Sequence, residues 1–186
     1  MFVGIYDIDC EIMANILDKI DFYSGTERKK MLKNANIKHP KNAGSMLYGT
    51  TWRGYLSPTK NRTKDEETGL YKTKVMDLHP ELKDIFRTFA DFHFADFEWK
   101  QVQMNKNFMC PPHKDSTNIG ESILVTCGDF TGGKTFVEFP DGVKSFECKE
   151  KPFKFNGSLY THWVEPWEGT RYSLVFFNNT SSKRKK

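Results

Sequence analysis

A histidine and an aspartate lie one residue apart in the middle of the chain, in the stretch CPPHKDSTNIGES at residues 110–122. On an extended backbone His113 and Asp115 project from the same face, because side chains alternate along a strand. Together they can grip one divalent cation, but two side chains do not fill its coordination sphere. His162, in the stretch LYTHWVEPW, is the best candidate for a third ligand. The sequence therefore predicts a metal site built from two distant parts of the chain.

Two imidazoles and one carboxylate on one face of a metal ion leave coordination positions open for other molecules. This ligand set is typical of non-haem Fe(II) oxygenases. The 47 residues from Asp115 to His162 allow about four short strands with their turns. A chain of that length can go around a small barrel and return to the metal.

An arginine near the end of the chain could supply a second kind of binding group. Alternation along the stretch TRYSLVFF places four side chains on one face: Arg171, Ser173, Val175 and Phe177. An arginine that faces the inside of a β-sandwich is costly unless it meets an anion. Guanidinium matches a carboxylate in a bidentate fork, and the Ser173 hydroxyl can add a bond. A dicarboxylate with an α-keto acid at one end, 2-oxoglutarate, would bridge the metal and the arginine.

These residues carry a resemblance to a known superfamily. HKD at 113–115, the Gly132-Gly133 turn, His162 and RYS at 171–173 resemble the HxD, H and RxS signature of Fe(II)/2-oxoglutarate-dependent dioxygenases. The resemblance covers residues 97–178. Within the superfamily, the stretches NKNFMCPPHKD, GDFTGGKTFVE and GTRYSLVFF are most similar to the TET/JBP-like branch and its viral and algal relatives.

The resemblance implies a role for each matching residue. His113, Asp115 and His162 would form the catalytic Fe(II) site, and Arg171 with Ser173 would bind the distal carboxylate of 2-oxoglutarate. Asn105 and Asn107, ahead of the HxD motif, are further candidates for binding the cosubstrate. The implied reaction uses O2 and 2-oxoglutarate to hydroxylate a C–H bond, releases succinate and CO2, and has ascorbate as the reductant that keeps the iron as Fe(II).

The elements that must position this site differ between the two halves of the chain. From residue 97 onward, alternating and β-branched stretches predict about seven or eight short strands, with turns at 131–133, 140–142, 156–157 and 166–169. That spacing favours an antiparallel jelly roll. With helices preceding it, the predicted fold class is α+β, a double-stranded β-helix core.

Two helices are expected in the first half. Apolar spacing predicts one over residues 9–20 with Asp9 as the N-cap, and another from Pro80 towards Phe92. Between them, residues 40–74 show little periodicity and could form a lid over the substrate or a surface insertion with one or two short strands. Within it, three side chains are candidates to bind substrate: Trp52, Arg53 and Tyr55.

Length and composition predict one globular domain. The chain has 186 residues, of which 38% are hydrophobic and 28% charged. We divide it into a helical and loop part at 1–96, a jelly-roll core at 97–178 and a basic tail at 179–186. The net charge of +4 equals that of the last four residues, so the remaining chain is neutral. That neutrality counts against a nucleic-acid partner, although residues 26–41 carry a local charge of +5.

The compartment is predicted from cysteines and from the N-terminus. The four cysteines form no CxxC pair, and acidic residues within the first twenty positions disfavour a signal peptide. No apolar run approaches membrane-spanning length. We expect an intracellular protein, cytoplasmic or nuclear, that is a monomer without a membrane partner.

The substrate stays open at this stage. The first hypothesis is oxidation of a base in DNA or RNA, such as a 5-methylpyrimidine. The second is hydroxylation of a protein side chain or a small molecule on the same core, since a fold does not decide its substrate. A jelly-roll binding module without catalysis is the third. Metal-dependent hydrolysis also fits the three metal ligands, but it gives Arg171 no task.

Overall fold

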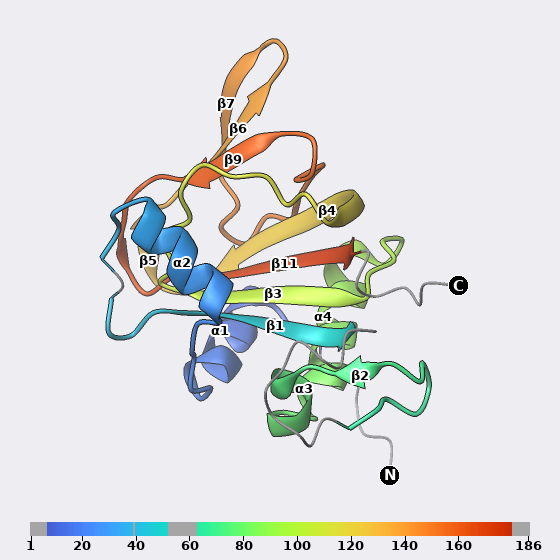
Figure 1. The fold of residues 1–186 in the computed structure, drawn as a ribbon. Helices are drawn as coiled ribbons and strands as arrows, with labels where there is room; N and C mark the ends of the chain where they lie inside the picture. The colour runs from blue at the N-terminus through green and yellow to red at the C-terminus, as the bar shows by residue number, and fades with distance from the viewer. Residues whose placement is uncertain (1–6, 39, 52–62, 180–186) are drawn as a thin grey trace.

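Antiparallel sheets form the framework of the protein (Figure 1). The computed structural model describes residues 7–38, 40–51 and 63–179. The largest sheet has six strands, in the spatial order β2 (Tyr71–Lys72), β1 (Gly44–Thr51), β3 (Gln101–Lys106), β11 (Tyr172–Asn179), β4 (Asn118–Cys127) and β8 (Phe153–Phe155). Strands from both halves of the chain therefore belong to one sheet, because β1 pairs with β3 and β3 pairs with β11.

Two smaller sheets complete the jelly roll. One has three strands, in the order β7 (Gly142–Phe146), β6 (Thr135–Phe139) and β9 (Thr161–Val164). The other pairs β10 (Trp167–Gly169) with β5 (Phe130–Gly132). The predicted Pro-Asp-Gly turn joins β6 to β7, and this hairpin projects from the body in Figure 1. The α+β jelly-roll prediction is confirmed.

Three helices cover one face of the six-stranded sheet. They are α1 (Cys10–Asp18), α3 (Lys74–Leu78) and α4 (Leu82–Phe94). Their apolar faces form one buried cluster with alternate residues of β3 and β11, such as Met104, Leu174 and Phe176. The opposite face of β3 and β11 lines the cavity described below. Strand alternation thus divides the hydrophobic core from the functional side of the sheet.

The two predicted helices are present with small shifts. Asp9 caps α1 as expected, since its carboxylate accepts a hydrogen bond of 2.8 Å from the Ile12 amide. The helix predicted from Pro80 to Phe92 is α4, displaced by two residues at each end. A further helix, α2 (Thr26–Asn34), was not predicted; it buries only Leu32, so its sequence lacks an apolar stripe.

Residues 40–74 contain two strands, β1 and β2, as one of the two expectations had it, but β1 is not part of a surface insertion. Residues 44–51 form β1, a mostly buried strand inside the six-stranded sheet. Its glycines are required by close contacts: a Cβ on Gly44 would lie 2.7 Å from the Phe22 Cβ, and one on Gly49 would lie 2.7 Å from the Lys100 carbonyl oxygen. The candidate substrate residues Trp52, Arg53 and Tyr55 lie outside the described residues.

The second half contains more strands than predicted. Nine described strands, β3 to β11, follow residue 97, because the predicted turns at 131–133 and 166–169 include β5 and β10. These two strands pair with each other, with Trp167 opposite Gly132. None of the described helices is long and apolar enough to cross a membrane.

Candidate metal and anion site

His113 is held by backbone pairing with β9. Its amide donates to the His162 carbonyl oxygen at 3.1 Å, and the His162 amide donates back to the His113 carbonyl oxygen at 2.9 Å. Two residues further on, the Asp115 amide donates to the Gly157 carbonyl oxygen at 2.9 Å. The bonds of His113 attach the segment at 110–115 to β9, the edge strand of the three-stranded sheet, and the bond of Asp115 attaches it to the loop before β9. Residues 49 positions apart in the sequence thereby lie side by side.

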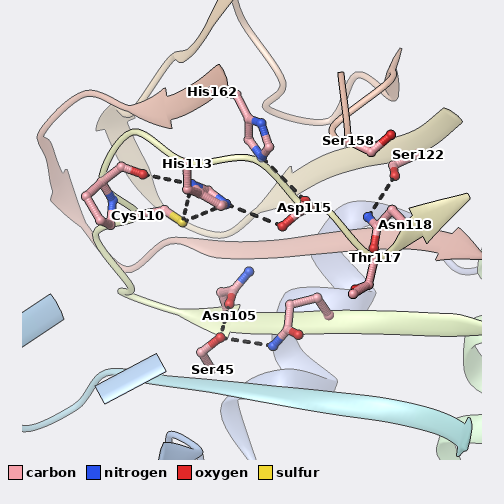
Figure 2. Close-up of polar contacts among 12 residues, drawn as sticks. Ser45, Asn105, Cys110, His113, Asp115, Thr117, Asn118, Ser122, Ser158 and His162 are labelled. Carbon is pink, nitrogen blue, oxygen red and sulfur yellow. Dashed lines mark hydrogen bonds and ion pairs between the residues drawn. The ribbon is translucent and has the colours of Figure 1, made fainter. Parts of the chain in front are cut away.

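The three predicted ligand side chains converge (Figure 2). The Nε2 atom of His113 lies 3.5 Å from Asp115 Oδ1, and the Nε2 atom of His162 lies 3.5 Å from Asp115 Oδ2. One ligand atom from each residue lies within 4.8 Å of the others. The three residues predicted to lie together therefore do so in the structure, and their ligand atoms could hold one metal ion.

Each imidazole is oriented by a backbone carbonyl. His113 Nδ1 lies 2.7 Å from the Pro111 oxygen, and His162 Nδ1 lies 3.0 Å from the Tyr160 oxygen. A carbonyl oxygen only accepts, so Nδ1 carries the hydrogen in both rings. When the rings are neutral, as metal binding requires, the lone pair of each is on Nε2, which faces the carboxylate. This arrangement fixes the tautomer that a metal ligand requires.

The charges of the site are coupled. Burial would lower the pKa of His113, but Asp115 and the Cys110 side chain at 3.5 Å together raise this pKa to about 10. Burial would raise the pKa of Asp115, but the two histidines hold it well below its usual range. Without a metal ion, the carboxylate is thus neutralised by imidazolium, and a cation that binds here must displace a proton.

Gly157 leaves the space that the ligands need. A Cβ at this position would lie 3.1 Å from Asp115 Oδ2 and 3.3 Å from His162 Cε1. Any larger residue would therefore press on two of the three ligand side chains. Sequence reasoning identified this position only as a turn.

Arg171 lies at another part of the same cavity and is almost fully buried, with 4% of its surface exposed. Its guanidinium carbon lies 5.6 Å from the Phe130 ring centroid and 5.3 Å from that of Trp167. Burial lowers the pKa of Arg171 to about 10, so it stays protonated at neutral pH. Its Nε has no hydrogen-bond partner among the described residues. A buried cation with an unsatisfied donor is suited to an anionic ligand.

The Gly-Gly turn makes room for this arginine. A Cβ on Gly133 would lie 2.9 Å from Arg171 Nε, and one on Gly132 would lie 2.9 Å from the Pro166 carbonyl oxygen. Gly132 and Gly133 also have positive φ angles, of 80° and 72° respectively. The turn predicted from sequence therefore leaves the space that the Arg171 side chain occupies.

The remaining predicted cosubstrate residues separate into two groups. Ser173 and Asn105 line the cavity, and Asn105 Nδ2 donates to Ser173 Oγ at 3.0 Å. Asn105 also accepts a hydrogen bond from Ser45, which belongs to β1 (Figure 2). Asn107 is not among the cavity-lining residues; its Oδ1 accepts a hydrogen bond of 2.8 Å from the Arg171 amide. Asn107 thus holds the backbone of the arginine, which differs from the direct contact expected.

The cavity has a volume of about 190 Å³ and lies between the large sheet and the three-stranded sheet. Besides the predicted metal ligands and Arg171, its lining includes apolar side chains such as Leu124, Val175 and Phe177. It also includes Arg28, from the unpredicted helix α2. No pattern in the sequence could place Arg28 here, because only the tertiary fold brings α2 to the cavity.

Comparison with known proteins gives matches by fold only. No protein-family profile matches the chain, and no curated protein matches it in sequence. Similar solved structures include NgTET1 in complex with 5mC DNA, which is 18% identical with a TM-score of 0.47, over 86% of this chain and 68% of that one. A 2OG-Fe(II) oxygenase family oxidoreductase from Burkholderia pseudomallei is 16% identical with a TM-score of 0.43, over 76% and 69% of the two chains. A prolyl-4-hydroxylase from Pseudomonas putida is 12% identical with a TM-score of 0.40, over 82% of each chain.

Proposed function

We propose that this chain is an Fe(II)- and 2-oxoglutarate-dependent dioxygenase that hydroxylates a C–H bond of a bound substrate. The observation that carries the proposal is that one cavity holds both a convergent His-Asp-His cluster and a buried arginine with an unpartnered donor. A metal site alone would suit many reactions. The addition of an inward cation favours a cosubstrate that binds the metal at one end and carries an anion at the other.

Fe(II) would be held by His113 Nε2, His162 Nε2 and a carboxylate oxygen of Asp115. The fixed tautomers and the space beside Gly157 fit this ion. When bound, Fe(II) supplies O2-dependent oxidation of a C–H bond, coupled to conversion of 2-oxoglutarate to succinate and CO2. The protein holds the reactants and limits access of water, since the three ligand side chains are 10–22% exposed.

Arg171 would bind the distal carboxylate of 2-oxoglutarate. The guanidinium lies close to the rings of Phe130 and Trp167, which can stack with it and limit its movement. Ser173 and Asn105 lie along the same wall and can add hydrogen bonds to the cosubstrate. A carboxylate would also offset the cost of burying the arginine without a partner.

For the substrate, we propose a base in DNA or RNA, such as a 5-methylpyrimidine. The charge that favours this class is the local +5 of residues 26–41, part of which lies beside the cavity. A protein side chain or a small molecule is the alternative on the same core. A non-catalytic binding module is a more remote alternative, because it would not need both a metal cluster and an anion receptor.

The proposal is tested by incubating the full chain with Fe(II), 2-oxoglutarate and ascorbate, and measuring succinate. The assay is run with and without duplex DNA that contains 5-methylcytosine. Succinate that depends on iron supports a dioxygenase, and stimulation by the DNA supports the base as substrate. If no succinate forms under either condition, with metal bound, the proposed activity is wrong.

A further inference from the structure

The helix α2 and the segment at 111–117 form the two sides of a groove on the surface. Four residues line both this groove and the cavity: Arg28, His113, Asp115 and Thr117. The groove therefore leads from the surface to the candidate metal ligands. A polymeric substrate bound in this groove could therefore place one of its side groups in the cavity.

Positive charge is concentrated in residues 26–41, the segment that contains α2. Residues 26–41 contain six lysine or arginine residues and one acidic residue, and the last four residues of the chain contain four more basic ones. The rest of the chain has 18 basic and 23 acidic residues. The small net charge of the protein is therefore the sum of two opposite parts. The chain outside residues 26–41 and 183–186 is net negative, and the helix α2 beside the cavity is net positive. Such local fields steer and hold polyanions.

The cations are distributed along the groove and on the outer side of α2. Arg28, Lys30 and Lys114 line the groove. Its acidic members are Glu27 and Asp115, and Asp115 is assigned to the metal. An adjacent hollow on α2 is lined by Lys29, Leu32, Lys33, Asn36, Ile37 and Lys38, none of which is acidic.

Packing does not explain the composition of α2. Leu32 is its one buried residue, and the other side chains are exposed or half-exposed. A helix of this kind adds little to the hydrophobic core. Its lysines have no described ion-pair partner, in contrast to Lys83 and Lys106, which pair with Glu67 and Asp18. The charge of α2 is therefore available to a ligand.

Where the groove meets the cavity, the wall is polar and can recognise a heterocycle. Thr117, Asn118 and Asn179 line the cavity, and Asn179 Nδ2 donates to Thr117 Oγ1 at 2.9 Å. The aromatic rings of Phe155 and Phe177 are part of the same lining. Amide groups and aromatic faces together suit a flat ring with hydrogen-bonding edges.

We propose that α2 and residues 111–117 form the docking groove for a nucleic-acid strand. Arg28, Lys30 and Lys114 contact the phosphates that flank one nucleotide, whose base enters the cavity. The enclosed position of the metal ligands requires that this base leaves its stack. This inference rests on the proposed function, because it takes the cavity to be the place of oxidation.

The experiment measures binding of a fluorescein-labelled single-stranded oligonucleotide to the full chain by anisotropy, over a series of salt concentrations. The test variant is Arg28→Gln with Lys30→Gln, and the matched control is Lys19→Gln with Lys151→Gln. Both change the charge equally, and Lys19 and Lys151 are exposed and line neither the groove nor the cavity. Glutamine preserves helix propensity close to that of lysine.

Each lost phosphate contact should weaken binding by about an order of magnitude near 0.1 M salt. The test variant should also lower the slope of log affinity against log salt by about 1.4, the contribution of two contacts to a single strand, whereas the control keeps the wild-type slope. Equal losses in the two double variants would overturn the proposal. Binding of polyglutamate as tightly as the oligonucleotide would also overturn it, since the groove would then not select nucleic acid.

Binding of Mn(II) and 2-oxoglutarate by the same wild-type sample separates this inference from the proposed function. If both bind while the oligonucleotide does not, the docking groove is wrong and the dioxygenase proposal stands. If neither binds, the dioxygenase proposal is wrong as well.

Discussion

At the scale of single residues, the site combines groups that are each costly to bury alone. Asp115 is compensated by two histidines whose Nδ1 atoms are held by carbonyl oxygens. Arg171 lies close to two aromatic rings, and its Nε has no hydrogen-bond partner among the described residues. These residues could be predicted from their types and spacing in the sequence, although the structure places His113, Asp115 and Arg171 outside its strands. The space at Gly157 could not, since it depends on which side chain approaches from another strand.

Replacing Arg171 tests the anion-binding role. Arg171→Gln should raise the half-saturating 2-oxoglutarate concentration by about 100-fold, the effect of losing roughly 3 kcal/mol from a buried charge pair. Mn(II) affinity should stay at the wild-type level, because the proposed metal ligands are other residues. Calorimetric titrations of both ligands measure this, and an unchanged 2-oxoglutarate affinity would remove Arg171 from the site.

Replacing Gly157 tests the space beside the ligands. Gly157→Ala places a methyl group 3.1 Å from Asp115 Oδ2 and should weaken Mn(II) binding by about tenfold, as changes around metal ligands do. Gly25→Ala is the matched control, since a Cβ there meets nothing within 4 Å. Metal titrations followed by electron paramagnetic resonance compare the two variants. Equal affinities would mean that the ligands can move away from the added methyl group.

At the scale of elements, the parts that sequence reasoning missed share a cause. β1 contains two glycines and pairs with β3 more than fifty residues away, so its strand character comes from tertiary pairing. α2 buries one residue and has no apolar stripe. By contrast, α1 and α4 were predicted because their buried faces recur at helical spacing. Local patterns thus identify elements that pack on the core, and they fail for elements whose place is decided by distant partners.

The end of α4 gives a prediction on stability. Burial lowers the pKa of His93 below 6.5, although a hydrogen bond with the Ile8 backbone opposes this, and the ring lies 4.2 Å from that of Phe89. The unfolded chain then binds the proton more readily, so His93 destabilises the folded state as the pH falls from 6.5 towards its folded pKa. Above that window the effect is absent.

We therefore expect wild type to lose more stability than His93→Gln between about pH 7.5 and pH 5.5. Urea unfolding at each pH measures the free energy of unfolding, and groups other than His93 titrate equally in both proteins. Parallel curves for the two proteins would show that burial of this ring is not linked to stability.

At the scale of the whole molecule, the six-stranded sheet has two different faces. One packs on α1, α3 and α4 through alternate residues of β3 and β11, and the other lines the cavity. The cavity is closed on its far side by the three-stranded sheet, which supplies His162. Because α2 is positively charged and most of the remaining chain is net negative, the electrostatic field of the protein attracts anions towards α2. The jelly-roll core was predictable from strand spacing, whereas the place of α2 beside the cavity was not.

The central claim is that one cavity binds a metal ion and 2-oxoglutarate together. The most direct measurement is calorimetric titration of 2-oxoglutarate into wild type and Asp115→Ala, each with and without Mn(II). Wild type should bind one equivalent of Mn(II), which strengthens 2-oxoglutarate binding, and Asp115→Ala should lose both the metal and that increase. If Asp115→Ala binds Mn(II) and 2-oxoglutarate as wild type does, the two ligands do not meet at His113, Asp115 and His162, and the claim is contradicted.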